Sequence, residues 1–182
     1  MPDSHLGETG PDGRVAVWDA AVRLLHWSLA AGVLFDFYLD DGGWAHRMVG
    51  YAAAGVVVAR LLWAAFAGGA ASFAALKPSL RDTVSYLRLG APRTRAHDPL
   101  GLWMIWLLWL LVLLLGITGW MSRLDAFWGD EGIRTVHEWL AHALLIAVVV
   151  HLSGVIAMSL RWRDNLVAAM LTGRKRSSDR DD

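Results

Sequence analysis

Cysteine is absent from this chain of 182 residues. Its absence excludes disulfides, iron–sulfur clusters, thiolate metal sites and haem attached through thioether bonds. Charge is also scarce, at 19% of the residues, and 17 basic side chains balance 17 acidic ones. A net charge of zero gives no signal for a polyanionic partner, and we therefore predict no binding to nucleic acid.

Apolar residues dominate the sequence, with 55% hydrophobic side chains and 11 tryptophans. A helix needs about 20 mostly apolar residues to cross a bilayer. Four runs meet this length, and the third of them contains no charged residue at all: 20–39, 48–67, 100–121 and 136–160. The sequence thus predicts an all-α membrane protein with a bundle of four transmembrane helices.

Lysine and arginine are distributed unevenly between the two ends of these runs. One side carries only Arg47, Arg123 and Arg134. The other side, which includes both termini, carries the remaining basic residues: Arg14, Arg23, Arg60, Lys77, Arg81, Arg88, Arg93, Arg95, Arg161, Arg163, Arg174, Lys175, Arg176 and Arg180. Because basic residues concentrate on the cytoplasmic side of a membrane, both termini are expected there.

The segments outside the four runs divide the chain further. Residues 1–14 lack a hydrophobic core, so we interpret them as a flexible cytoplasmic tail and not as a signal peptide. Residues 15–173 form the expected four-helix domain, and residues 174–182 a charged tail. Between the second and third runs, residues 76–90 repeat apolar side chains every three or four positions, which predicts a short amphipathic helix. It lies either on the membrane surface or against the bundle.

Three histidines occur in the fourth run, where a purely apolar sequence would be expected. A helix turns about 100° and rises about 1.5 Å per residue. His137 and His151 therefore share one face and lie about 21 Å apart along the axis. His142 points about 140° away from His137, and we interpret it as a residue at a helix contact or at the lipid edge.

Two further histidines match the depths of this pair. His46 opens the second run on the outer side, and His26 lies near the inner start of the first. Two imidazoles facing each other across a bundle are the axial ligands of a b-type haem. We therefore predict an outer pair, His46 with His137, and an inner pair, His26 with His151. A single membrane histidine is more often a hydrogen-bonding group, and a proton or metal transporter would also use such residues.

Other residues near these depths suit a haem. Gly50 and Gly154 follow a predicted ligand by about one helical turn and would let a flat macrocycle approach, although glycine also serves close helix packing. Cations for the propionates would be Arg47 and Arg134 on the outer side and Arg23 and Arg60 on the inner side, unless these side chains reach for lipid headgroups. Asp36 and Glu138 are interfacial acids or proton carriers, and His97, next to an expected helix cap at Asp98, is interpreted as structural.

Six stretches of the sequence form a recognisable pattern: VWDAAVRLLHW, HRMVGY, RLLW, HDPLG, VHEWLAHALLIAVVVHLSGV and RDNLVAAMLTGRKR. Through them the sequence resembles the bacterial cytochrome b561 family, in particular its cytochrome b/b6-domain or hydrogenase-type branch. The resemblance covers roughly residues 15–176. In HDPLG, Asp98 replaces an asparagine of the family pattern.

The resemblance implies two b haems ligated at the positions of His26, His46, His137 and His151. It also implies electron transfer between a periplasmic redox partner, such as a c-type cytochrome or another oxidoreductase subunit, and membrane quinone. A stand-alone oxidoreductase, a superoxide:quinone or ferric reductase, is the alternative, and a homodimer is an open possibility.

Overall fold

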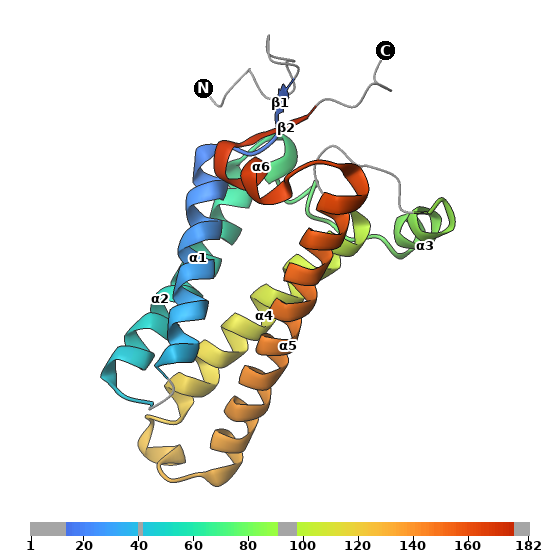
Figure 1. The fold of residues 1–182 in the computed structure, drawn as a ribbon. Helices are drawn as coiled ribbons and strands as arrows, with labels where there is room; N and C mark the ends of the chain where they lie inside the picture. The colour runs from blue at the N-terminus through green and yellow to red at the C-terminus, as the bar shows by residue number, and fades with distance from the viewer. Residues whose placement is uncertain (1–13, 40–41, 91–97, 177–182) are drawn as a thin grey trace. The chain divides into compact units, whose positions relative to one another are not determined.

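The computed structural model describes residues 14–39, 42–90 and 98–176 of the chain. Their elements, labelled in Figure 1, are β1 (Arg14–Ala16), α1 (Ala20–Tyr38), α2 (Trp44–Phe66), η1 (Gly69–Ala71), α3 (Leu80–Arg88), α4 (Pro99–Met121), η2 (Asp125–Phe127), α5 (Glu131–Trp162), α6 (Leu166–Thr172) and β2 (Arg174–Arg176). Apart from two short strands, the regular structure is helical, as the sequence predicts. His97, for which the sequence predicts a structural role, lies outside the described residues.

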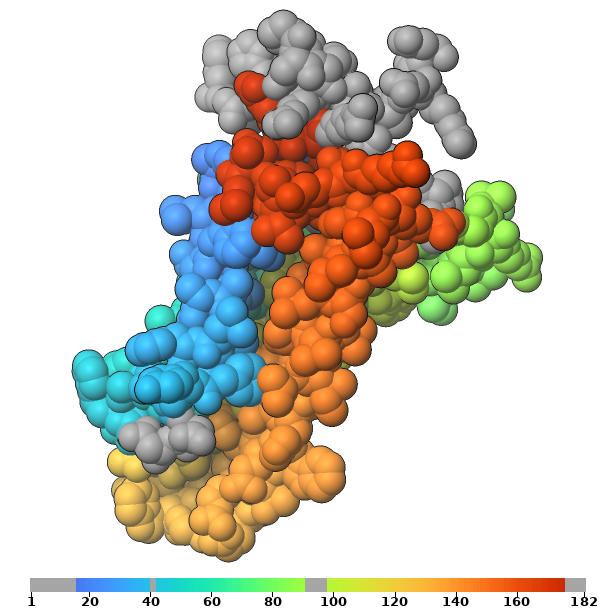
Figure 2. All heavy atoms as spheres, in the orientation of Figure 1, coloured from blue at the N-terminus to red at the C-terminus, as the bar shows by residue number. Residues whose placement is uncertain are grey.

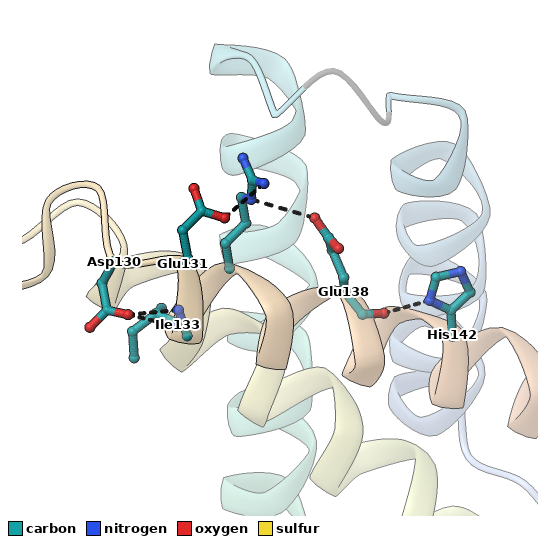
Figure 3. Close-up of polar contacts among 7 residues, drawn as sticks. Asp130, Glu131, Ile133, Glu138 and His142 are labelled. Atoms are coloured by element: carbon teal, nitrogen blue, oxygen red, sulfur yellow. Dashed lines mark hydrogen bonds and ion pairs between the residues drawn. The ribbon is translucent and has the colours of Figure 1, made fainter.

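Four of these helices are long and apolar enough to cross a membrane: α1, α2, α4 and α5. They coincide with the four predicted runs, and the charge-free α4 has the highest mean hydropathy, 2.5. The largest differences are at the helix starts. α2 begins at Trp44 and α5 at Glu131, four and five residues earlier than predicted. The reason at α5 is a cap, because Asp130 Oδ1 accepts hydrogen bonds from the backbone N–H groups of Gly132, at 2.7 Å, and Ile133, at 3.3 Å (Figure 3).

The start of α4 follows the predicted capping pattern. The Asp98 carboxylate accepts a 2.8 Å hydrogen bond from the backbone N–H of Gly101, and Pro99 is the first helical residue. Proline is suited to that position because a backbone N–H there has no acceptor inside the helix, and proline carries no N–H. The residues of the HDPLG motif therefore fix where this membrane helix begins.

Two short helices lie outside the four long ones. α3 begins after Ser79, whose hydroxyl accepts from the N–H of Asp82 at 3.3 Å. It falls within the segment for which the sequence predicts an amphipathic helix. α6 begins after Asn165, whose side chain accepts from the N–H of Ala168 at 2.9 Å. Both helices thus start at a polar side chain that satisfies an otherwise unpaired backbone donor.

A two-stranded sheet was not expected from the sequence. β1 pairs antiparallel with β2, so that Arg14 lies opposite Arg176 and Ala16 opposite Arg174, next to α6 in Figure 1. Gly173 makes the connection possible, since its φ of 79° is in the left-handed region and its carbonyl accepts from Val17 N–H at 2.9 Å. A side chain at Gly173 would collide with the Trp18 carbonyl, because a Cβ would lie 2.7 Å from that oxygen. Strands of three residues carry too little periodicity to be recognised.

The chain divides into two compact units. The first unit comprises Met1–Leu24, Leu62–Trp103 and His151–Asp182, and the second comprises Leu25–Leu61 and Met104–Val150. All four long helices contribute residues to both. Within the second unit, α5 exposes large apolar side chains such as Trp139, 72% exposed, and Ile146, 65% exposed, and its orange surface is visible in Figure 2. Such faces suit contact with lipid, because exposing large apolar side chains to water costs free energy, whereas exposing them to lipid chains does not.

Candidate functional site

His46 and His137 are brought together inside the second unit. His46 lies in the first turn of α2 and His137 in the second turn of α5, and their ring centres are 6.2 Å apart with the ring planes at 78°. Two imidazoles that each place a nitrogen about 2 Å from one shared metal ion have ring centres roughly 6 Å apart. The observed separation therefore suits two ligands on opposite sides of one iron atom.

A cavity of about 250 Å³ surrounds the pair. All four long helices contribute lining residues, most of them apolar, such as Val33, Val112 and Leu144. Four glycines also line it: Gly42, Gly50, Gly116 and Gly119. Any side chain at Gly119 would touch the His137 ring, since a Cβ would lie 3.5 Å from its Cε1 atom. A Cβ at Gly116 would lie only 3.0 Å from that of Ala54. Gly119 thus leaves space directly beside the His137 ring, whereas Gly116 allows close packing on Ala54.

Each of these two histidines has an oxygen atom next to its Nδ1. The Asp36 Oδ1 atom of α1 lies 3.1 Å from His46 Nδ1. The Thr118 Oγ1 atom of α4 lies 2.8 Å from His137 Nδ1. Partners on Nδ1 direct the other ring nitrogen, Nε2, towards a metal, as is usual for histidine ligands in proteins.

The donor set can be tested against a haem. Among the residues that the structure describes, no three histidine, aspartate or glutamate side chains converge in a geometry suited to a bare metal ion. A b haem takes only two ligands from the protein, because its ring supplies four nitrogens to the iron. Two imidazoles, an apolar cavity and glycine walls therefore fit a haem.

Three arginines line the same cavity: Arg47, Arg123 and Arg134. Arg47 donates to the Gly42 carbonyl at 3.4 Å, and Arg123 lies 5.1 Å from the ring centre of Trp128. Arg134 is paired with Glu131 at 2.9 Å and more weakly with Glu138 at 3.7 Å (Figure 3). The predicted outer cations, Arg47 and Arg134, are thus at the cavity, and Arg123 is a third that was not assigned to the propionates.

The second unit also contains two residues of the predicted inner site. His26 is half-buried, and its ring packs edge-on against Trp27 with 5.2 Å between the ring centres. Arg60 is 6% exposed, and its guanidinium carbon lies 5.7 Å from the centre of the Trp109 ring. A buried arginine requires compensating interactions, and the aromatic face supplies one. Arg60 is therefore the most buried of the four predicted propionate partners.

The other inner residues belong to the first unit. His151 is half-buried, and Gly154 lies one turn further along α5. Apart from the backbone of α5 itself, no described residue comes within 4 Å of the position that a Cβ of Gly154 would take. Arg23 donates from Nη1 to the Leu171 carbonyl at 2.6 Å, which ties α1 to the end of α6. The pairing of His26 with His151 remains a prediction.

His142 lies away from the cavity. Its side chain is exposed, and its Nδ1 contacts the Glu138 carbonyl oxygen of its own helix at 2.8 Å (Figure 3). Glu138 itself is exposed and pairs with Arg134. This geometry is the one expected for a histidine at the lipid edge.

Thr118 was not recognised from the sequence. It is 8% exposed and is the one hydroxyl-bearing residue in the otherwise apolar run 100–121. That isolation was a usable signal, because a polar group inside a membrane helix usually has a partner. The contact of Asp36 with His46 was also missed, although Asp36 had been singled out as an acid near the outer face.

Comparison with known proteins identifies the family of the chain. The family model described as prokaryotic cytochrome b561 matches residues 17–173. The chain belongs to this family, which is consistent with b-type haem, electron transfer and four membrane-crossing helices. No match is found among curated proteins or among solved structures.

Proposed function

We propose that this prokaryotic cytochrome b561 transfers electrons across the membrane through two b haems, each held by two histidines. The observation that carries the proposal is the His46–His137 pair, with ring centres 6.2 Å apart beside a cavity of about 250 Å³. A bound b haem supplies a one-electron couple of ferric and ferrous iron. Histidines on both sides leave the iron no open position for substrate, which favours electron transfer over chemistry at the metal.

In this proposal His46 and His137 hold the haem on the periplasmic side, and His26 and His151 hold one on the cytoplasmic side. The first pair is supported by its contact geometry. The second pair is supported by the helical phase of His151 relative to His137, which places both on one face of α5, and by the matching depth of His26 in α1.

The four predicted arginines balance the propionates in this proposal. Arg47 and Arg134 are supported on the outer side because both line the cavity. On the inner side, Arg60 is supported by its burial beside Trp109, whereas Arg23 keeps one nitrogen on the Leu171 carbonyl. Charge-assisted bonds to carboxylates are stronger than neutral ones, so these cations would also help to retain the group.

The glycines have separate roles in the proposal. Gly50 lines the outer cavity, and Gly154 has open space where a side chain would lie. Both follow a proposed ligand by about one helical turn, where the backbone would face a flat ring.

The setting is proposed to be the bacterial inner membrane, with both termini in the cytoplasm and residues 15–173 as the cytochrome domain between two polar tails. The support is the excess of basic residues on one side of the four helices. α3 would lie on the cytoplasmic membrane surface, since Leu80 and Leu89 are each 72% exposed there and two arginines flank them. The proposed partners are membrane quinone and a periplasmic redox protein such as a c-type cytochrome or another oxidoreductase subunit. A homodimer is a further arrangement to test.

A stand-alone superoxide:quinone or ferric reductase is the second candidate. The observation in its favour is that Arg47, Arg123 and Arg134 all line the cavity and would attract a small anion. The pairing of Arg134 with Glu131 and Glu138 opposes it by cancelling part of that charge. Turnover of superoxide or ferric iron by the purified protein without a partner would favour this candidate.

The proposed function is tested by purifying the protein from haem-replete cells. A pyridine haemochrome assay should give two non-covalent b haems per chain, and the reduced-minus-oxidised spectrum should show low-spin b-type bands. One haem or none per chain would refute the two-haem proposal.

A further inference from the structure

We propose that Asp36 and Thr118 are positioning residues for the outer histidine pair, and that Asp36 lowers the reduction potential of the haem bound there. The inference rests on the proposed function, because it concerns the residues behind His46 and His137. Asp36 and Thr118 would orient the imidazole rings of these two histidines and set how strongly the rings donate electrons to the iron.

The contact between Asp36 and His46 is a close and sheltered one. Oδ1 and Nδ1 are 3.1 Å apart, with side chains 20% and 26% exposed, respectively. Both atoms are inaccessible to solvent, and neither makes a hydrogen bond of good angle with any described group. Asp36 Oδ1 is therefore the nearest acceptor for His46 Nδ1, and a small rotation of the imidazole would align its N–H with the carboxylate.

Gly50 makes space for this contact. It lies one turn after His46 in α2, and a Cβ there would come within 3.4 Å of the second carboxylate oxygen of Asp36. A larger side chain would push the carboxylate away from the ring. The glycine one turn after the proposed ligand thus has a role besides any contact with the haem.

The contact between Thr118 and His137 determines the position of a proton. The Thr118 hydroxyl lies 2.9 Å from the Leu114 carbonyl and 3.2 Å from that of Leu115, and both are acceptors only. The single hydroxyl proton is donated to this turn of α4, so that Oγ1 is left as an acceptor for His137 Nδ1 at 2.8 Å. His137 must then carry its proton on Nδ1 and present the lone pair of Nε2.

The two histidines therefore have unequal partners, a carboxylate behind His46 and a hydroxyl behind His137. A carboxylate that accepts from Nδ1–H increases the basicity of the imidazole, and a more basic ligand stabilises ferric iron more than ferrous iron. Asp36 should accordingly lower the potential of the outer haem, while Thr118 should mainly orient its ring.

Asp36→Asn and Asp36→Ala test the first role. Asp36→Asn keeps the shape but removes the charge, and the midpoint potential of the outer haem should rise with haem content unchanged. Asp36→Ala should also weaken haem retention, by about 10- to 100-fold in affinity, as is common when a ligand loses its partner. Asp82→Asn is the charge control, because it removes an exposed carboxylate on α3, which contributes no residue to the proposed haem sites. It should leave the potential near that of the wild type.

Thr118→Val and Thr118→Ser test the second role. Valine matches threonine in shape but lacks the oxygen, so it should weaken haem retention and shift the low-spin optical and electron paramagnetic resonance spectra. Serine keeps the acceptor and should restore the wild-type spectrum. Equal behaviour of the two variants would overturn the role of Thr118.

The outcomes separate this inference from the proposed function. If the wild type binds haem and His46→Ala loses one, but Asp36→Asn leaves the potential unchanged, the inference about Asp36 is wrong and the function stands. A rise no larger than that of Asp82→Asn would also overturn it. If His46→Ala keeps the full haem content, the outer ligand pair itself is wrong.

Discussion

The rings of His46 and His137 meet at 78°, with 6.2 Å between their centres, although one residue opens α2 and the other lies in α5. Neither helix alone places these residues together. The pair arises because α2 and α5 each contribute a histidine to the same cavity.

Single alanine substitutions should reveal which histidines share a haem. His46→Ala and His137→Ala should each remove the same spectral component and leave about one haem per chain, because the inner site keeps both ligands. His26→Ala and His151→Ala should remove the other component. The measurement is a haem count combined with a redox titration.

Double variants provide the control for this pairing. His46→Ala/His137→Ala should match either single variant, whereas His46→Ala/His151→Ala should lose both haems. If His46→Ala and His137→Ala instead remove components of different potential, the proposed pairs are incorrect.

A larger side chain at Gly119 should displace His137. A Cβ at position 119 would lie 3.5 Å from the His137 imidazole. The remaining side-chain atoms of the leucine in Gly119→Leu would therefore overlap the ring. The variant should lose the outer haem, whereas Gly119→Ala should retain it. Gly55→Leu is the matched control on α2, because a Cβ there has no neighbour within 4 Å. Equal haem content in the two leucine variants would contradict this role for Gly119.

His142→Ala should leave both haems in place. The side chain is exposed. Among the described residues, the hydrogen-bond partner of its ring is the Glu138 carbonyl of the same helix. Haem content and the low-spin spectrum of the purified variant should equal those of the wild type. Loss of a haem would mean that the face of α5 assigned to the ligands is incorrect.

Tyr86 should make stability depend on pH in the alkaline range. Burial raises the pKa of its hydroxyl above the usual 10.0, Asp98 raises it further, and Arg161 opposes the rise. The folded protein therefore holds this proton more tightly than the unfolded chain does. The corresponding stability is fully present below pH 10.0 and is lost as the pH rises from there towards the folded-state pKa.

Tyr86→Phe separates this effect from general alkaline unfolding. Within the described residues the hydroxyl oxygen is buried without a hydrogen-bond partner, so its removal should leave stability at pH 7 unchanged or higher by up to about 1 kcal/mol. Thermal unfolding in detergent from pH 8 to pH 11 should show a smaller decline for the variant. Parallel curves for the two proteins would show that Tyr86 is not the responsible group.

The sequence by itself determined the four membrane helices, the capped start of α4 at Asp98 and the shared face of His137 and His151. These features are local. Helix formation, capping and the direction of a side chain depend on residues within a few positions of one another, and hydrophobic length depends on composition alone.

Only the tertiary structure decided which groups lie behind the histidines and that β1 pairs with β2. The contact of Thr118 with His137, that of Asp36 with His46 and the pairing of β1 with β2 all join residues from different elements. Such contacts depend on how far each helix is rotated and shifted against its neighbour. That register is set by packing at points such as Gly116 against Ala54, where a Cβ would lie 3.0 Å from its neighbour, and no local pattern in the sequence encodes it.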